Sequence, residues 1–287
     1  MTALFKRVVN VSVGPRGSPG ALGALKGSMA FDLSNLDCVF HVKKSLKPEP
    51  NTCELHLYNL ARPTRSVLET AERLFLRLDA GYPGSVGQIF LGEVRSAHSR
   101  PEGADIITEI STGDSEKELA TSRINLSVGP NVHASYVLAQ LAQALGGGLG
   151  NVSAAVAKLT AKGATFFGYG QGTAFAGNAA EELTTFCRAV DLEWSIQDGV
   201  LQILERGTPI EAQAVLLSPS TGLIGTPSVD HKGIASATAL IQPDLTPGRK
   251  VTFDSMGLSG TYRITDCEFS GDTAGSDWYV KLTADSV

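Results

Sequence analysis

The residues that could carry chemistry are five histidines, four cysteines and a few closely spaced carboxylates. No histidine falls in a His-Glu-x-x-His pattern or beside a Gly-x-Ser-x-Gly motif. Asp230-His231 is the only adjacent acid–histidine pair, and no nucleophile can be assigned to it. Asp191 and Glu193 could be imagined as a glycosidase pair, but two positions apart on one strand they lie too close for the inverting geometry. The sequence therefore predicts no catalytic residue, and we expect a protein that is not an enzyme.

The sequence also gives little evidence for a metal or cofactor site. Cys38, Cys53, Cys187 and Cys267 show no Cys-x-x-Cys spacing, which disfavours zinc. Each lies in an apolar strand or helix pattern, so we predict buried, reduced thiols. The Asp272–Asp277 segment does not match a calcium loop and is more typical of a solvated hairpin turn. We expect no metal and no cofactor.

Two glycine-rich stretches could be mistaken for phosphate loops. The stretch 146–150 lacks the Gly-Lys-Ser/Thr ending and follows a helical pattern, so we interpret it as a helix stop. The stretch 168–172 has the same weakness and is more typical of a loop that lets backbones approach closely.

Composition sets the broad class. The chain has 287 residues, enough for about two domains, with 43 % hydrophobic and 18 % charged residues. The formal net charge of −5 argues against a basic nucleic-acid-binding domain, although DNA could still pass by without being bound. We find no signal-peptide pattern and no apolar run of about 20 residues, so we expect a chain that folds in the cytoplasm without entering a membrane.

The N-terminal third is predicted to be β-rich. Alternating valines indicate a strand over 8–13, followed by a Gly/Pro-rich loop over 14–20, and a second strand region over 29–42 precedes a polar loop over 43–50. We name residues of the two loops as candidate partner contacts: Gly14, Arg16, Gly17, Lys43, Lys44 and Lys47. A plain mobile loop and a solvated lysine cluster are the alternative interpretations.

The rest of this third continues the pattern. A half-buried strand is predicted over 53–57 and a short helix over 62–71, with Pro63 tolerated in its first turn. Strands over 74–80 and 88–98 follow, and the segment 105–112 is expected to pair with the strand before it.

The middle of the chain changes to α+β. Apolar residues at helical spacing predict helices over 132–145, 151–159 and 178–190, and Asn178 is the expected N-cap of the last one. A hairpin over 193–204 should turn at Asp198-Gly199, the dipeptide favoured in type I′ turns.

Four motifs mark the C-terminal stretch. They read Gly222-Leu-Ile-Gly-Thr-Pro227, Leu240 to Gly248 with three prolines or glycines, Gly260-Thr-Tyr-Arg-Ile264 and Gly271 to Tyr279. Their regular glycines and prolines and their β-branched and aromatic residues predict short strands joined by tight turns. In order and spacing they resemble the C-terminal barrel of bacteriophage tail baseplate hub proteins, whose relatives include the hub part of type VI secretion spikes. Leu57 to Arg65 similarly resembles the first barrel of that family.

The resemblance implies a mainly β fold in which two β-barrel-like domains, residues 1–113 and 206–287, flank an α+β domain, residues 114–205. It implies a structural subunit of a virion, assembled in the host cytoplasm. Three such chains would present six related barrels to a sixfold tail tube, as a homotrimeric ring between the tube and the central spike. DNA would pass through the lumen without specific binding, and we expect a lumen that is not strongly basic.

Two other functions stay open at this point. A cell-wall hydrolase carried on a tail would need a paired acid or a metal triad in the middle domain. A carbohydrate-binding β module would need exposed aromatic side chains, which are scarce at 7 % of the sequence. Trp194 and Trp278 lie in strand patterns and are predicted to pack in the core or at an interface.

Overall fold

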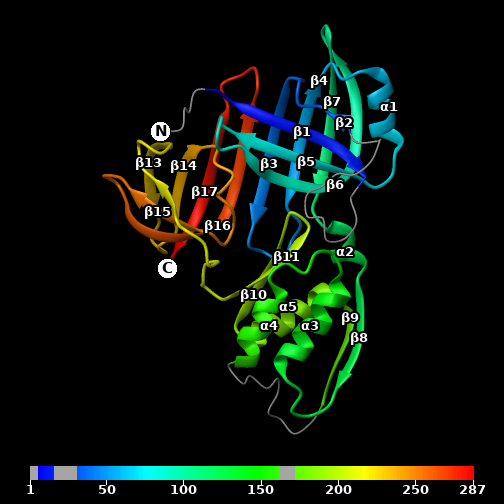
Figure 1. Ribbon diagram of the computed structural model, residues 1–287, viewed down its shortest axis with the longest axis vertical. Coiled ribbons are helices and arrows are strands. Elements are labelled where there is room, and N and C mark those ends of the chain that lie inside the picture. The colour runs from blue at the N-terminus through cyan, green and yellow to red at the C-terminus, as the bar shows by residue number, and fades with distance from the viewer. Residues whose placement is uncertain (1–5, 16–30, 162–171) are drawn as a thin grey trace. The chain divides into compact units, whose positions relative to one another are not determined.

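A computed structural model describes residues 6–15, 31–161 and 172–287 (Figure 1). The chain divides into two compact units. The β unit comprises Met1–Ser45, Asn51–Asp114 and Pro209–Val287, and the α+β unit comprises Leu46–Pro50 and Ser115–Thr208. The further division of the β unit into two barrel-like domains stays a prediction. No helix within the described ranges is long and apolar enough to cross a membrane.

The β unit is built on one large, mainly antiparallel sheet. Its strands follow the order β13-β14-β17-β16-β3-β4-β7-β6-β5-β1-β2, and β15 pairs with both β16 and the short parallel strand β12. The elements are β1 (Val8–Pro15), β2 (Phe31–Asp32), β3 (Cys38–Ser45), β4 (Thr52–Tyr58), α1 (Arg62–Thr70), β5 (Leu74–Gly81), β6 (Gly87–Glu102), β7 (Asp105–Gly113), β12 (Val215–Leu217), β13 (Leu223–Val229), β14 (Ala235–Leu240), β15 (Lys250–Asp254), β16 (Ser259–Asp272) and β17 (Trp278–Ser286).

The two β-rich ends of the chain meet at one strand pair. β3 and β16 are antiparallel neighbours over seven residue pairs from Asp266↔Ser45 to Asp272↔Val39, and Val42 lies opposite Phe269. Figure 1 shows the blue and cyan strands beside the orange and red ones at this junction. The sheet therefore joins segments more than two hundred residues apart in the sequence.

One face of this sheet forms the core. Residues at alternate positions on neighbouring strands, among them Leu55, Leu57, Phe40 and Phe269, are fully buried. This alternation is what a strand with one buried face requires. The strand predicted over 53–57 is confirmed as β4, and the predicted pairing of 105–112 with the strand before it is confirmed as β7 on β6.

Among the described strands the sheet ends at β13, at β2 and, on the branch through β15, at β12, so the described strands form no closed barrel. β13 departs from a flat edge strand. Its register on β14 shifts between Ile224 and Ser228, Gly225 has a φ of 69°, and Pro227 lacks an N–H group. A bulge and a proline are devices that keep an edge strand from pairing indiscriminately.

Two boundaries differ from the sequence prediction. The loop predicted from Lys43 begins later, because β3 continues through Ser45. Gly14 and Pro15 belong to β1 and not to the predicted loop, whose remaining residues, 16–20, lie outside the described residues. The strand region predicted over 29–42 is interrupted after Asp32, whose carboxylate accepts hydrogen bonds from both the backbone and the hydroxyl of Ser34. These bonds favour a turn over a continuous strand, and they lower the pKa of Asp32.

The α+β unit holds the predicted helices and hairpin. Its elements are α2 (Glu116–Thr121), β8 (Arg123–Val128), α3 (Ala134–Leu145), α4 (Val152–Ala161), β9 (Thr173–Asn178), α5 (Ala179–Ala189), β10 (Leu192–Gln197) and β11 (Val200–Glu205). Strand β8 pairs with β9, and β10 pairs with β11. The helices bury their apolar sides in a core of their own that includes Leu138, Leu183 and Trp194.

Local signals explain where these elements begin and end. The Asn178 side chain accepts hydrogen bonds from the backbone N–H groups of Ala180 and Glu181, which confirms it as the N-cap of α5. Asp198 and Gly199 have φ values of 57° and 75°, as a type I′ turn requires. Gly146, with a φ of 81°, ends α3, so this stretch is the predicted helix stop.

Candidate interaction surface

The face of the large sheet opposite the core is polar. Along β3, β4, β7 and β6 many of the residues between the buried positions are charged or polar. Several of them lie opposite one another on neighbouring strands, such as His41 opposite Glu54 and Glu109 opposite both His56 and His98. We call this set the polar ladder: His41, Lys43, Glu54, His56, His98, Arg100, Glu109 and, from β16, Glu268.

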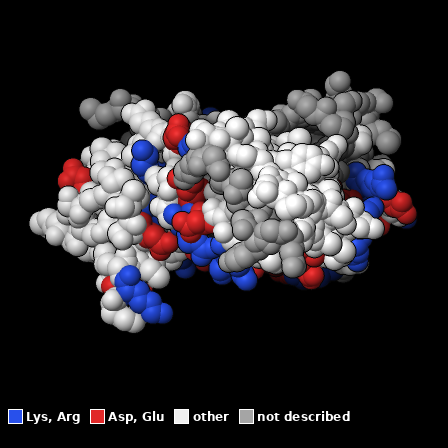
Figure 2. All heavy atoms as spheres, turned by 90° about the horizontal axis from the view of Figure 1, so that it is seen from below, with Lys and Arg blue, Asp and Glu red and all other residues white. Residues whose placement is uncertain are grey.

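Positive and negative groups alternate on this ladder. The Nε2 atom of His41 lies 2.7 Å from a carboxylate oxygen of Glu268, and the Nζ atom of Lys43 lies 3.8 Å from the same oxygen. Arg100 donates from Nε to Glu109 at 2.9 Å and also contacts Glu102. The hydrogen bond from Arg100 lowers the pKa of Glu109, and the neighbouring His56 and His98 act in the same direction. In the view of Figure 2, from below, acidic and basic side chains are also found close to one another.

This arrangement suits contact with a protein surface better than catalysis. Exposed ion pairs add little stability but give an interface its register and orientation. No group of three or more metal-ligating side chains occurs within the described ranges. All four cysteines are free and buried, which confirms the prediction of reduced core thiols. Burial raises the pKa of Cys38, Cys53 and Cys187 to about 12, so these thiols stay protonated and unreactive at neutral pH.

The candidate contact residues have different surroundings. Lys43 and Lys47 are exposed, whereas Lys44 faces the core side of β3 and is only 3 % exposed. Gly14 is buried within β1, opposite Phe75 of β5. Arg16 and Gly17 lie outside the described residues. A partner contact at any of these six positions stays a prediction.

Other candidate sites have structural explanations. The carboxylate of Asp272 accepts from the backbone N–H groups of Ala274 and Gly275, which closes the turn between β16 and β17. This is the hairpin turn that the sequence favoured over a calcium loop. The carboxylate of Asp230 accepts from the N–H groups of Lys232 and Ile234, so it holds a turn and does not orient His231.

Sequence reasoning missed the role of Arg7. Its guanidinium donates to the carbonyl oxygens of Asp272 and Gly275, both at 2.7 Å, and to that of Ser276 at 2.9 Å. It also lies over the ring of Trp278, 5.5 Å from the centroid. A lone arginine near the start of the chain gives no signal in the sequence, because its partners are carbonyl groups, which every residue has.

Solved structures with this fold include phage tail proteins and a component of the type VI secretion system. The 43 kDa tail protein of prophage MuSo2 from Shewanella oneidensis has a TM-score of 0.62 at 12 % identity, with 98 % of each chain covered. A tail protein from Neisseria meningitidis MC58 has a TM-score of 0.57 at 10 % identity, covering 98 % of this chain and 96 % of that one. An Escherichia coli component of the type VI secretion system, c3393, has a TM-score of 0.54 at 10 % identity, covering 88 % and 74 %. At these identities the likeness concerns the fold alone.

The fold is therefore that of phage tail proteins and of spike components of type VI secretion. The family described as Baseplate hub gp41 matches residues 27–284, and the chain belongs to this family. No curated protein matches the sequence. The family resemblance inferred from the four C-terminal motifs is confirmed, and the protein has a structural role in a phage tail or baseplate.

Proposed function

We propose that the protein is a baseplate hub subunit that forms a trimeric ring, joins the tail tube to the central spike and surrounds the DNA channel. The family match over residues 27–284 carries this proposal. It acts by geometry and not by catalysis, as a component of the virion that is assembled in the host cytoplasm.

The single continuous sheet supports the ring. The β3–β16 junction fixes the N-terminal and C-terminal strands to each other within one chain. If residues 1–113 and 206–287 act as two barrel-like halves, three chains supply six of them, which suits a sixfold tube. Closed assemblies of this kind are the usual solution for homo-oligomers.

The charge pattern supports passage of DNA without binding. Cations on the polar ladder lie beside carboxylates, as Lys43 does beside Glu268 and Arg100 beside Glu109. Affinity for DNA grows with the number of phosphates that unpaired cations neutralise. We expect a lumen that is not strongly basic, and a continuous channel of lysine and arginine in an assembled ring would contradict this.

The mass of the purified chain in solution tests the ring. The monomer has a mass of 30.1 kDa, and a closed trimer predicts three times that, about 90 kDa, by light scattering. If the chain is monomeric alone, adding the tail-tube protein should produce a complex with three copies. Failure to associate with the tube protein, with itself and with the spike would contradict the proposal.

The predicted contact residues can be tested in the same assay. Charge reversal by Lys43→Glu or Lys47→Glu should weaken association with the tube or spike. The glutamate introduced at either exposed position would repel an acidic surface of the partner. Lys232→Glu, at an exposed turn, is the matched control. Equal association of all three variants would remove Lys43 and Lys47 from the interface.

The alternative function, a cell-wall hydrolase, is tested separately. A turbidity assay on bacterial cell walls should show no lysis.

A further inference from the structure

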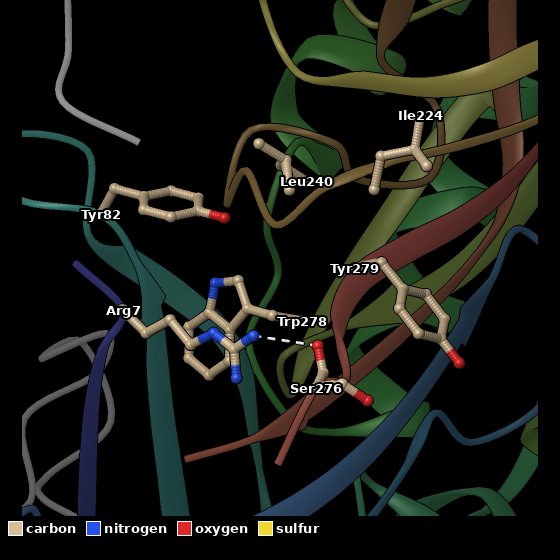
Figure 3. Close-up of a pocket in the computed structure, with 7 residues that line it drawn as sticks. All are labelled: Arg7, Tyr82, Ile224, Leu240, Ser276, Trp278 and Tyr279. Carbon is tan, nitrogen blue, oxygen red and sulfur yellow. Dashed lines mark hydrogen bonds between the residues drawn. The ribbon is translucent and has the colours of Figure 1, made fainter. Parts of the chain in front are cut away.

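A hollow in the β unit has the features of a binding site that the fold itself does not use. Its volume is about 340 Å³, and seven residues line it (Figure 3): Arg7, Tyr82, Ile224, Leu240, Ser276, Trp278 and Tyr279. They come from the segment before β1, the end of β5, the strands β13, β14 and β17, and the turn before β17. Distant parts of the chain thus converge here.

One buried donor in the hollow meets no acceptor among the described residues. Tyr82 and Trp278 are each 3 % exposed. The Nε1 atom of Trp278 is covered from water and has no hydrogen-bond partner in the described part of the chain. The hydroxyl of Tyr82 points toward the same side of the hollow as the indole nitrogen (Figure 3). A buried donor without an acceptor is unfavourable, so an acceptor that reaches the indole nitrogen gains a hydrogen bond that the fold leaves unmade.

The hollow is electropositive. Among the described residues that line the hollow, Arg7 is the only lysine or arginine, and none carries a carboxylate. The hydrogen-bond partners of Arg7 in the described ranges are neutral carbonyls, and the Asp272 carboxylate next to them is engaged by the N–H groups of its own turn. The guanidinium charge therefore has no dedicated counter-ion among the residues that the structure describes.

The rim of the hollow is apolar. The Ile224 side chain is 43 % exposed. Leu240 lies beside it on the neighbouring strand, since Leu223 of β13 pairs with Ala239 of β14. The combination of donors and a cation inside with aliphatic side chains outside fits an acidic side chain that has an apolar neighbour.

We propose that this hollow binds a carboxylate presented by a segment of a partner polypeptide. Arg7, Tyr82 and Trp278 act as the donors, and Ile224 and Leu240 contact the apolar neighbour of the acidic residue. The carboxylate displaces the side-chain edges that cover the indole nitrogen and accepts from it and from the Tyr82 hydroxyl. A nucleic acid is disfavoured because one arginine in an acidic chain of net charge −5 gives little attraction for a polyanion. The inference deepens the proposed function by giving the hub one defined protein contact.

The indole N–H of Trp278 provides a direct readout. The chain has two tryptophans, so full-length protein labelled with ¹⁵N-tryptophan gives two indole signals, and the Trp278 signal is the one missing from Trp278→Phe. The probe is the peptide acetyl-Leu-Glu-Leu-amide, and acetyl-Leu-Gln-Leu-amide is the neutral control. We expect the Glu peptide to move the Trp278 signal saturably with a Kd of about 1 mM or tighter, while the Trp194 signal stays in place.

Variants locate the response in the hollow. Arg7→Gln and Tyr82→Phe should each weaken binding of the Glu peptide by about tenfold, because each removes a hydrogen bond to a charged acceptor. Tyr58→Phe, on β4 and outside the lining of the hollow, should bind as the parent does. A circular dichroism spectrum like that of the parent shows that the β unit of each variant is folded, because Trp194 reports only on the α+β unit.

Three results would overturn the inference: a Trp278 signal that does not move, equal responses to the Glu and Gln peptides, or a larger response to a DNA duplex. These results are separable from the proposed function. A chain that assembles with tube and spike but ignores the peptide keeps its role as a hub and loses this site. A chain that binds the peptide but never assembles keeps the site and loses the hub role.

Discussion

The side chains of His41 and Glu268 meet across the junction of β3 and β16, with the Nε2 and Oε1 atoms 2.7 Å apart. The pair marks where the two ends of the sequence become one sheet. Its side chains are 33 % and 39 % exposed, so the pair itself contributes little to stability. The buried neighbours on the other face, such as Phe269 opposite Val42, hold the junction together.

Truncation of Phe269 should therefore destabilise the whole β unit. Phe269→Ala removes a fully buried ring and is expected to lower the free energy of unfolding by about 3–5 kcal/mol. Glu268→Gln, the adjacent surface residue, should change it by less than about 1 kcal/mol. Urea unfolding followed by circular dichroism measures both. A small effect of Phe269→Ala would mean that the junction does not couple the two strand sets.

Gly271 is predicted to tolerate no side chain. A Cβ atom there would lie 2.2 Å from the ring of Phe40, which is itself packed edge-on against Trp278. Gly271→Ala has to displace this buried ring and should cost about 1–3 kcal/mol, as overpacked cores do. Gly129→Ala is the control, because a Cβ atom at that position meets nothing within 4 Å. Equal melting temperatures of the two variants would contradict the packing described here.

The cysteines should not react with thiol reagents in the native protein. All four are buried, and burial raises the pKa of Cys38, Cys53 and Cys187 to about 12. At pH 8 a colorimetric thiol assay should detect almost no free thiol until denaturant is added, and then four per chain. Rapid modification of the folded chain would contradict the burial.

The same groups give a pH dependence with a defined sign. The folded state holds the thiol protons more tightly than the unfolded state does. The resulting contribution to the free energy of unfolding is fully present below the ordinary thiol pKa of 9.0. This contribution is lost as the pH rises from 9.0 toward about 12. We expect the midpoint of urea unfolding to fall over this alkaline range. Cys53→Ala, which removes one such thiol, should show a shallower fall than the parent protein.

The N-cap of α5 is a test within the α+β unit. Asn178→Ala removes the side-chain acceptor for the N–H groups of Ala180 and Glu181 and should cost about 1 kcal/mol. Asn125→Ala, at an exposed position of β8, should have a negligible effect. Thermal unfolding of both variants decides this, and a parent-like melting temperature of Asn178→Ala would show that the cap is dispensable.

The sequence by itself determined the elements whose causes are local. Asn178 caps a helix because its side chain reaches the next N–H groups, and Asp198-Gly199 turns a hairpin because both residues adopt positive φ. The alternation around Leu55 and Leu57 reveals a half-buried strand in the same way. The motifs after Gly222 likewise indicated the family, because they preserve turns at a characteristic spacing.

Only the tertiary structure decided which distant segments meet. Nothing local tells β3 to pair with β16, because backbone hydrogen bonds are the same for every residue and long-range register depends on the whole core. The Lys44 side chain points into the protein because β3 continues through Ser45, which keeps Lys44 on the same buried face as Val42. Arg7, Tyr82 and Trp278 likewise come together only through folding, and contacts made to carbonyl groups and ring faces leave no pattern in the chain.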